Sequence, residues 1–139
     1  MVLKLKEIIQ AFNNDKASVE EVLSDFEAVN TPSKEDVETF LKSKSYDMEV
    51  TGQAVTYLLL NDNALNDNQF IIDGYFTLAI KAFEFRNEIS KNGRRKLTGK
   101  SDDFVPAYLI GQLAKSSSAG HGVGKELLSQ AKSYICSAI

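Results

Sequence analysis

The residues with the clearest chemical potential form a short loop with three glycines near the end of the sequence. Gly120, Gly122 and Gly124 alternate with His121 and Val123. Glycine has no Cβ, so the backbone N–H groups of such a loop can approach a ligand closely. A helix that begins at Gly124 adds free N–H groups and a partial positive charge. The spacing therefore predicts an anion-binding site that suits a pyrophosphate group.

Two well-known phosphate-binding motifs do not describe this loop. Lys125 follows the last glycine, but neither Ser nor Thr follows the lysine, so the Walker pattern is not met. The dinucleotide-binding fingerprint needs G-x-G-x-x-G in the first βα turn, whereas this loop lies late in the sequence. A simpler interpretation stays open, in which the glycines only cap the helix.

Three segments rich in β-branched and aromatic residues predict the strands that position the loop. They are Ala54–Leu60, Phe70–Phe83 and Val105–Ala114. Asn61–Asn68 lies between the first two, and its Asn and Asp residues predict the turn of an antiparallel hairpin. Ser116–Gly124 then links the last strand to the final helix.

The middle strand is expected to carry apolar side chains on both faces, which indicates helices on each side of a central sheet. We expect Ile71 and Tyr75 on one face, and Ile72, Phe76 and Leu78 on the other. Together with the chain length, this order of elements predicts an α+β fold in a single domain that spans residues 1–139.

The first part of the chain is predicted to be helical. Residues 4–12 carry apolar side chains at helical spacing, although Leu3 and Leu5 alternate with lysines and leave a short first strand as an alternative. Ser18 and Glu21 form a capping box, which predicts a second helix that starts at Ser18.

Two further helices follow from their start and stop signals. Thr31 as N-cap before Pro32 predicts a helix that runs to about Met48, and Gly52 ends it. The last helix is predicted over Gly124–Ala138. Its inward residues are expected to be Leu127, Leu128, Ala131, Ile135 and Ala138.

Composition and cysteine usage exclude several classes of protein. Apolar residues make up 43% and charged residues 25%, which is typical of a soluble globular protein. No apolar run approaches the ~20 residues that a membrane span needs. The single cysteine, Cys136, excludes an internal disulfide and indicates a reducing cytoplasm. With one His and one Cys, no zinc site is expected.

The net charge of −3 hides an uneven distribution of basic residues. A run without acidic residues carries Lys91, Arg94, Arg95, Lys96 and Lys100. Such a loop on an acidic body can contact phosphates, but a solvated loop that keeps the protein soluble is the simpler interpretation.

The strand, glycine loop and last helix together resemble the GNAT superfamily of acetyl-CoA-dependent N-acyltransferases, closest to its toxin-like branch. The matching residues are Val105-Pro106, Leu109-Ile110-Gly111-Gln112-Leu113-Ala114, Gly120-His121-Gly122-Val123-Gly124 and Leu127-Leu128. Upstream matches are Phe26, Asp36-Val37-Glu38-Thr39-Phe40-Leu41, Thr56-Tyr57-Leu58-Leu59 and Gly74-Tyr75-Phe76-Thr77-Leu78. The match covers about residues 19–138 and consists of several motifs in the same order as in the family.

The resemblance implies acetyl-CoA as co-substrate, held by a strand and by the glycine loop. The pantetheine arm is expected along Leu113, Ala114 and Lys115. The pyrophosphate is expected in the loop that consists of Ala119, Gly120, His121, Gly122, Val123, Gly124 and Lys125. Ala119 stands where the family usually has Gln or Arg, which implies weaker binding of the cofactor. His121 is expected to be a solvent-exposed loop side chain.

The same resemblance implies that further elements complete the fold, since GNAT proteins continue with a strand, a helix and two more strands. The Val105–Ala114 strand then becomes an apolar sheet edge, which is expected to pair with a second copy or a completing chain. No catalytic residue is assigned, because the Tyr that serves this branch of the family as general acid lies in that further part. Tyr134 is expected only to pack in or beside the core. No Glu lies on the strand to serve as the general base.

Three functions remain open from the sequence. The first is transfer of an acetyl group to a primary amine of a small molecule, a protein or an aminoacyl-tRNA. The second is a catalytically inactive GNAT scaffold that acts as a binding or assembly protein, since a fold does not determine a function. The third, RNA binding through the basic run, has weak support because the run contains no aromatic residue.

Overall fold

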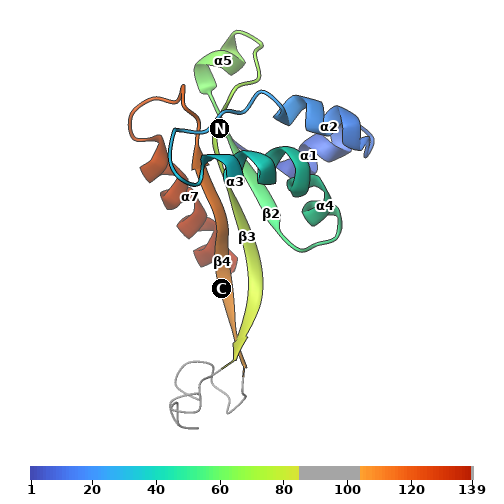
Figure 1. Ribbon diagram of the computed structural model, residues 1–139, viewed down its shortest axis with the longest axis vertical. Coiled ribbons are helices and arrows are strands. Elements are labelled where there is room, and N and C mark those ends of the chain that lie inside the picture. Colours follow the sequence, from blue (N-terminus) through green and yellow to red (C-terminus); the bar gives the residue numbers. More distant parts are fainter. Residues whose placement is uncertain (85–103, 139) are drawn as a thin grey trace.

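The computed structural model describes residues 1–84 and 104–138, which form an antiparallel sheet between two layers of helices (Figure 1). The four strands lie in the order β1-β2-β3-β4. They are β1 (Val2–Lys4), β2 (Val55–Leu60), β3 (Ile72–Glu84) and β4 (Phe104–Lys115). The predicted α+β class and the three predicted strands are confirmed. The basic run Lys91–Lys100 lies outside the described residues.

Helices cover both faces of the sheet, as the two-sided apolar pattern of β3 predicted. One layer consists of α1 (Leu5–Ala11), α2 (Lys16–Leu23), α3 (Lys34–Thr39), the π-helix η1 (Phe40–Lys44) and α4 (Ser45–Val50). The other layer is α7 (Val123–Ala138), shown in red in Figure 1. No helix in the described part of the chain is long and apolar enough to cross a membrane.

The start of the chain contains both elements that the sequence left as alternatives. Val2–Lys4 pairs with β2 as a strand, and α1 follows without a break. The Glu7 carboxylate accepts the Lys4 N–H at 3.0 Å, which stabilises the first turn of α1. The helix ends at Ala11 and is followed by two asparagines with positive φ, Asn13 and Asn14, a conformation that Asn tolerates better than most residues.

Two predicted helix starts are wrong by two or three residues. Helix α2 begins at Lys16 after Asp15, and Ser18 lies inside the helix, where its hydroxyl bonds to the Asp15 carboxylate. Asp15 comes earlier in the chain than Ser18 and can itself precede a helix, so the capping box does not form. Helix α3 begins after Ser33, because Thr31 and Lys34 first close a turn.

The helix predicted to run to about Met48 consists of three consecutive parts, α3, η1 and α4. It ends at Val50, and Gly52 follows two residues later, as predicted, with a φ of 74° that favours glycine. The predicted turn at Asn61–Asn68 contains a one-turn helix, α5 (Asp62–Asn66). The Asn61 side chain caps it by accepting the Ala64 N–H at 2.9 Å.

A bulge in β3 corrects the predicted distribution of apolar side chains between the two faces. Leu59 pairs with Gly74 and Leu60 pairs with Ile72, so Asp73 is an extra residue. The alternation therefore shifts by one position, and Ile72 lies in the same core as Tyr75. Ile71 precedes the strand and is 40% exposed. Phe76 and Leu78 share one face, as predicted, and that face packs against α7.

The inward face of α7 is mostly as predicted. Leu127 and Ala131 are fully buried, and Ile135 packs against the same core. Leu128 is 40% exposed, because the next position along a helix lies about 100° away from the buried stripe. Tyr134 packs on the Tyr57 ring at a centroid distance of 4.5 Å, which confirms its expected packing role.

Candidate cofactor-binding site

Strand β4 contains an irregularity just before the predicted site. Phe76 pairs with Leu113 and Leu78 pairs with Ile110, so two β4 residues, Gly111 and Gln112, lie opposite Thr77. This arrangement is a β-bulge, which bends the strand and changes the direction of the following backbone groups. The Gln112 N–H donates to the Thr77 hydroxyl at 2.9 Å.

Beyond the bulge, the backbone of β4 points alternately toward β3 and toward the open edge of the sheet. The Ala114 carbonyl faces Gly74 of β3, and the Ser116 N–H donates to Asp73 of the same strand. Leu113 and Lys115 therefore direct their N–H and C=O groups away from β3. Within the described sheet, β4 has a strand partner on one side only.

A short segment before α3 covers the last part of this open edge. Val29 N donates to Lys115 O at 3.1 Å, and Ser117 N donates to Glu27 O at 2.8 Å. Ala28 forms an isolated bridge with Ser116. Among the described residues, the bonds from this segment reach no further back along β4 than Lys115, and Leu113 lines a cavity beside the segment.

The segment Glu27–Val29 is held from α3 by charged side chains. The Glu38 carboxylate accepts the Ala28 N–H at 3.1 Å. Lys34 lies between two carboxylates, 3.1 Å from Glu27 and 3.7 Å from Glu38. The hydrogen bond to Glu27 raises the pKa of the Lys34 ammonium. The start of the glycine loop is therefore braced by contacts that begin on α3.

A cavity of about 230 Å³ lies between this segment, α3 and the end of β4. Its lining is mostly apolar, with two hydroxyl groups. The lining residues are Ala28, Val29, Thr31, Ser33, Val37, Leu113, Ala114 and Lys115. The cavity thus brings together the three β4 residues that the resemblance assigned to the pantetheine arm.

Two glycines of the loop, Gly120 and Gly124, border space that no protein atom fills. Gly122 has a φ of +87°, a conformation that L residues rarely adopt. A Cβ built on Gly120 or Gly124 would meet no atom within 4 Å, and neither residue has a positive φ. The fold alone therefore does not require glycine at these two positions, whereas a closely approaching ligand would.

The start of α7 supplies backbone donors beside this space. Glu126 donates to Gly122 O at 3.1 Å and makes the first backbone bond of the helix. The N–H groups of Val123, Gly124 and Lys125 precede that bond and have no acceptor within the helix. They carry the positive end of the helix dipole toward the loop.

The predicted site residues divide into anchors and exposed groups. Val123 and Ala114 are buried, and Ala119 packs against the α7 core, so these three hold the loop on the sheet. His121 and Lys125 are exposed, and Leu113 is 37% exposed. The residues predicted to contact the pyrophosphate and those predicted to contact the pantetheine arm lie at the two ends of one continuous segment, Leu113–Lys125.

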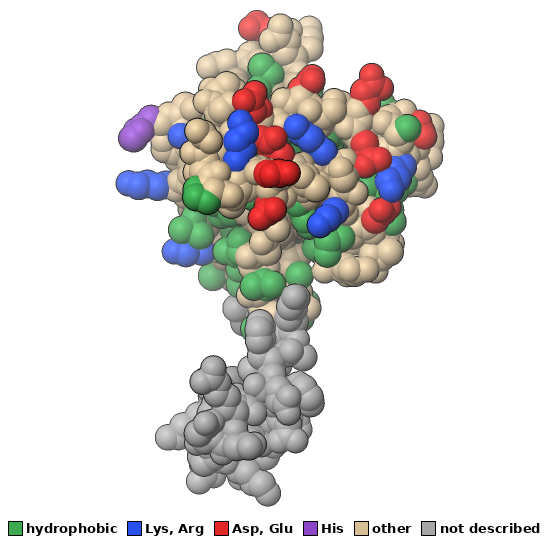
Figure 2. Space-filling model, viewed as in Figure 1, with side chains coloured by type: hydrophobic (Ala, Val, Ile, Leu, Met, Phe, Trp, Pro, Cys, Tyr) green, Lys and Arg blue, Asp and Glu red, His purple; other side chains and the backbone are tan. Residues whose placement is uncertain are grey.

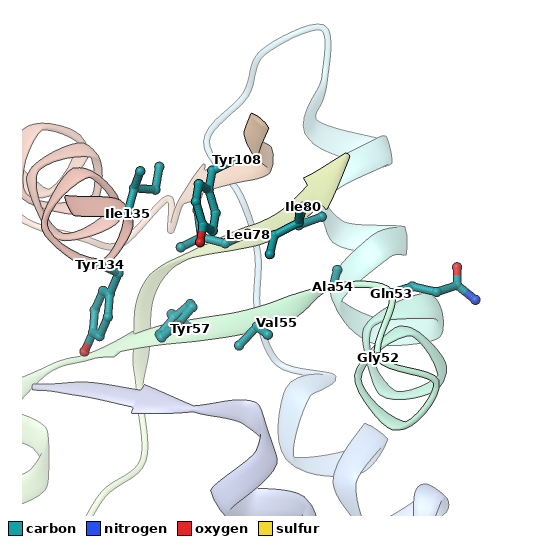
Figure 3. A pocket seen from close by; sticks show the side chains of 11 residues that line it. Gly52, Gln53, Ala54, Val55, Tyr57, Leu78, Ile80, Tyr108, Tyr134 and Ile135 are labelled. Carbon is teal, nitrogen blue, oxygen red and sulfur yellow. The ribbon is translucent and has the colours of Figure 1, made fainter. Parts of the chain in front are cut away.

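A second cavity, of about 260 Å³, lies on the α7 face (Figure 3). Sequence analysis did not indicate it, because its walls come from β2, β3, β4 and the last turns of α7. Tyr57, Tyr108 and Tyr134 line it together with aliphatic side chains, of which Ile80 is 66% exposed. The first cavity is lined by Val37, which belongs to the opposite helical layer. The two cavities therefore lie on opposite sides of the sheet.

The described surface does not carry a broad patch of one charge on the face shown in Figure 2. Lys and Arg side chains there are interspersed with Asp and Glu side chains over the helical layer. Among the described residues, no group of three or more His, Cys, Asp or Glu side chains could hold a metal ion.

The chain was compared with family models, with curated protein sequences and with solved structures, and only the solved structures match it. No family model and no curated protein sequence matches the chain. A structure of AtaTR bound with acetyl-CoA matches with a TM-score of 0.63 and 24% identity, and a point mutant of KacT gives the same values. AtaT complexed with acetyl-methionyl-tRNAfMet matches with a TM-score of 0.60. AtaT and KacT are GNAT-fold toxin acetyltransferases.

The chain has the GNAT fold. Each of these three matches covers 84% of this chain and 62% of the matched chain. The chain therefore spans less than two thirds of the length of AtaT and KacT. The GNAT-like fold that the sequence motifs indicated is confirmed.

Proposed function

We propose that this chain binds acetyl-CoA and transfers its acetyl group to a primary amine, with residues 1–139 acting as one GNAT-like domain. The observation that carries the proposal is the junction of β4 with α7. There, outward-pointing strand backbone leads into a loop whose Gly120 and Gly124 border empty space. A long ligand with amides at one end and a pyrophosphate at the other fits this combination.

In the proposed complex, the pyrophosphate lies in the Ala119–Lys125 loop and accepts the free N–H groups at the start of α7. The exposed Lys125 adds a positive charge there. The pantetheine arm runs back along β4, where Leu113 and Lys115 offer outward N–H groups. The acyl end then lies at the cavity of about 230 Å³ beside Leu113.

In the proposed reaction, a backbone N–H group rather than a side chain stabilises the charge that develops on the thioester oxygen. The lone pair of a neutral amine attacks the thioester carbonyl carbon, and an N–H on β4 stabilises the negative oxygen. The C–S bond then breaks, the nitrogen loses its proton, and the departing sulfur takes one up. No described side chain is assigned here as general acid or base.

The solved neighbours support this cofactor and suggest an acceptor class. AtaT has been solved with acetyl-CoA and, in another structure, with acetyl-methionyl-tRNAfMet. An aminoacyl-tRNA is therefore the first acceptor to test, followed by protein and small-molecule amines. The basic run Lys91–Lys100 in the sequence is consistent with a phosphate-bearing acceptor.

Isothermal titration of the purified chain with acetyl-CoA tests the proposal. We expect a dissociation constant in the micromolar range, followed by acetylation of one acceptor class in a radiolabel assay. Absence of binding at millimolar acetyl-CoA would contradict the proposed function. A titration with inorganic pyrophosphate serves as the control for charge alone.

A second candidate function is a binding or assembly role on a catalytically inactive GNAT scaffold. One AtaT structure is bound to the C-terminus of the antitoxin AtaR, and KacTA has been solved with DNA, so this fold also occurs in assemblies. In this chain, the edge of β4 from Ala107 to Leu113 would pair with a second copy or a completing chain. Acetyl-CoA binding without any turnover would favour this role.

A further inference from the structure

Buried polar side chains on β2 and β3 distinguish the region of the β4 bulge from the rest of the sheet. Thr56 and Thr77 are cross-strand neighbours, 1% and 2% exposed, on the face that α1–α4 cover. The Thr77 hydroxyl accepts the Gln112 N–H, whereas the Thr56 hydroxyl has no hydrogen-bond partner among the described residues. The two threonines thus share a buried environment, but only the Thr77 hydroxyl accepts a hydrogen bond from the β4 bulge.

We propose that Thr77 is a positioning residue that locks the β4 bulge and so directs the Leu113 N–H toward the thioester carbonyl of acetyl-CoA. This inference rests on the proposed function. Thr77 does not touch the cofactor, since its side chain lies within the core. Its effect passes through Gln112, whose N–H it holds at 2.9 Å.

The register shows what the bulge does to Leu113. With two residues opposite Thr77, Leu113 pairs with Phe76 and Ala114 pairs with Tyr75. Without the extra residue, Leu113 would lie opposite Tyr75, in the place that Ala114 now takes. Its N–H and C=O would then point toward β3, because strand backbone groups alternate in direction. The bulge therefore decides which backbone amide reaches the open edge.

Gly111 is the second part of the lock. A Cβ on Gly111 would lie 3.0 Å from the Thr77 hydroxyl oxygen, so a side chain there would push the threonine away. Gly111 does not have a positive φ, unlike Gly52 and Gly122. Glycine is thus needed at position 111 because Thr77 approaches the bulged backbone closely, and not because the backbone conformation is unusual.

The test compares Thr77→Val with Thr56→Val, two changes of the same chemistry at neighbouring buried positions. Thr77→Ser, which keeps the acceptor oxygen, is the conservative variant. Affinities for acetyl-CoA and for CoA are measured by isothermal titration, because only acetyl-CoA has the thioester carbonyl. The exchange rate of the Gln112 amide is measured by NMR in the free protein.

We expect Thr77→Val to speed Gln112 amide exchange by about tenfold and to remove most of the preference for acetyl-CoA over CoA. Thr77→Ser should restore both properties, and Thr56→Val should change neither. A general loss of stability would lower both affinities without changing their ratio. Equal behaviour of Thr77→Val and Thr56→Val would overturn the inference.

Failure of the inference is distinguishable from failure of the proposed function. If the unmodified chain binds neither acetyl-CoA nor CoA, the proposed function is wrong and the positioning role falls with it. If the unmodified chain prefers acetyl-CoA and Thr77→Val keeps that preference, the function stands and only the role of Thr77 is wrong.

Discussion

At the scale of single residues, partial burial changes the protonation of a carboxylate on α4. Glu49 of α4 is half-buried, and its carboxylate accepts the Thr56 N–H at 3.2 Å. Burial raises the pKa of Glu49, and this outweighs the opposing effect of the hydrogen bond and of Lys4 and Lys6. The charged form of Glu49 is thus less favourable in the folded chain than in the unfolded one.

This pKa shift predicts the effect of pH at Glu49. The folded pKa lies above the ordinary value of 4.5, so the contribution of Glu49 to stability is greatest below pH 4.5. That contribution is lost as pH rises through the folded pKa. Glu49→Gln keeps an oxygen for the Thr56 N–H and removes the charge. It should stabilise the fold at pH 7 by less than about 1 kcal/mol, because solvent screens a half-exposed group.

Thermal unfolding of both forms between pH 3 and pH 8 checks this expectation. The two curves of melting temperature against pH should converge at the acidic end. Glu20→Gln on α2 is a suitable control for the removal of one carboxylate. A melting temperature of Glu49→Gln below that of the unmodified chain at pH 7 would show that Lys4 and Lys6 dominate instead.

At the scale of elements, one position in the first turn of α7 is expected to affect the stability of the fold and the binding of acetyl-CoA in opposite directions. Gly124 lies inside α7, where alanine is a better helix former by about 0.5–1 kcal/mol. A Cβ at this position meets no atom of the protein within 4 Å, so the fold should tolerate it. The same Cβ would occupy the space that the proposed pyrophosphate needs.

Gly124→Ala is therefore expected to raise the melting temperature and to weaken acetyl-CoA binding by at least about tenfold, since the ligand loses its close approach to the backbone. Titration and thermal unfolding of the same sample measure both effects. Gly52→Ala provides the contrast, because its φ of 74° should make it destabilising without any effect on acetyl-CoA affinity. Unchanged affinity in Gly124→Ala would argue against the loop as the pyrophosphate site.

At the scale of the whole molecule, the described sheet has a long edge at β4, and among residues 1–84 and 104–138 a short segment bonds to this edge only near its end. From Ala107 to Ala114 this strand carries no charged residue, and Tyr108 and Leu113 are more than a third exposed. Natural sheets usually protect such edges with charges, proline or covering segments. This edge is suited to pairing with another strand, as in the second candidate function.

Proline substitutions test the pairing in a directional way. Leu113→Pro removes an N–H that points away from β3, so the sheet should remain folded while pairing at the edge is blocked. Ala114→Pro removes an N–H that faces β3 and should destabilise the fold by about 1–3 kcal/mol. Light scattering measures the oligomeric state, and thermal unfolding measures stability. A chain that is monomeric at all concentrations would contradict pairing between copies.

The sequence by itself determined the features that depend on near neighbours. Apolar spacing located the strands, and the glycine loop and last helix lie where they were predicted. The GNAT fold was expected from the resemblance of several motifs in a fixed order to that family, and the fold confirms it. The ends of helices were less certain, because Asp15 and Ser18 compete for the same start.

Tertiary structure decided the features that depend on how distant strands are aligned. The bulges at Asp73 and at Gly111–Gln112 exist only relative to a partner strand, and no local pattern reveals them. The segment Glu27–Val29 reaches the end of β4 across almost 90 residues of sequence. Hydrogen bonds between such segments form only in the folded chain, so which amide of β4 faces the open edge is a property of the fold.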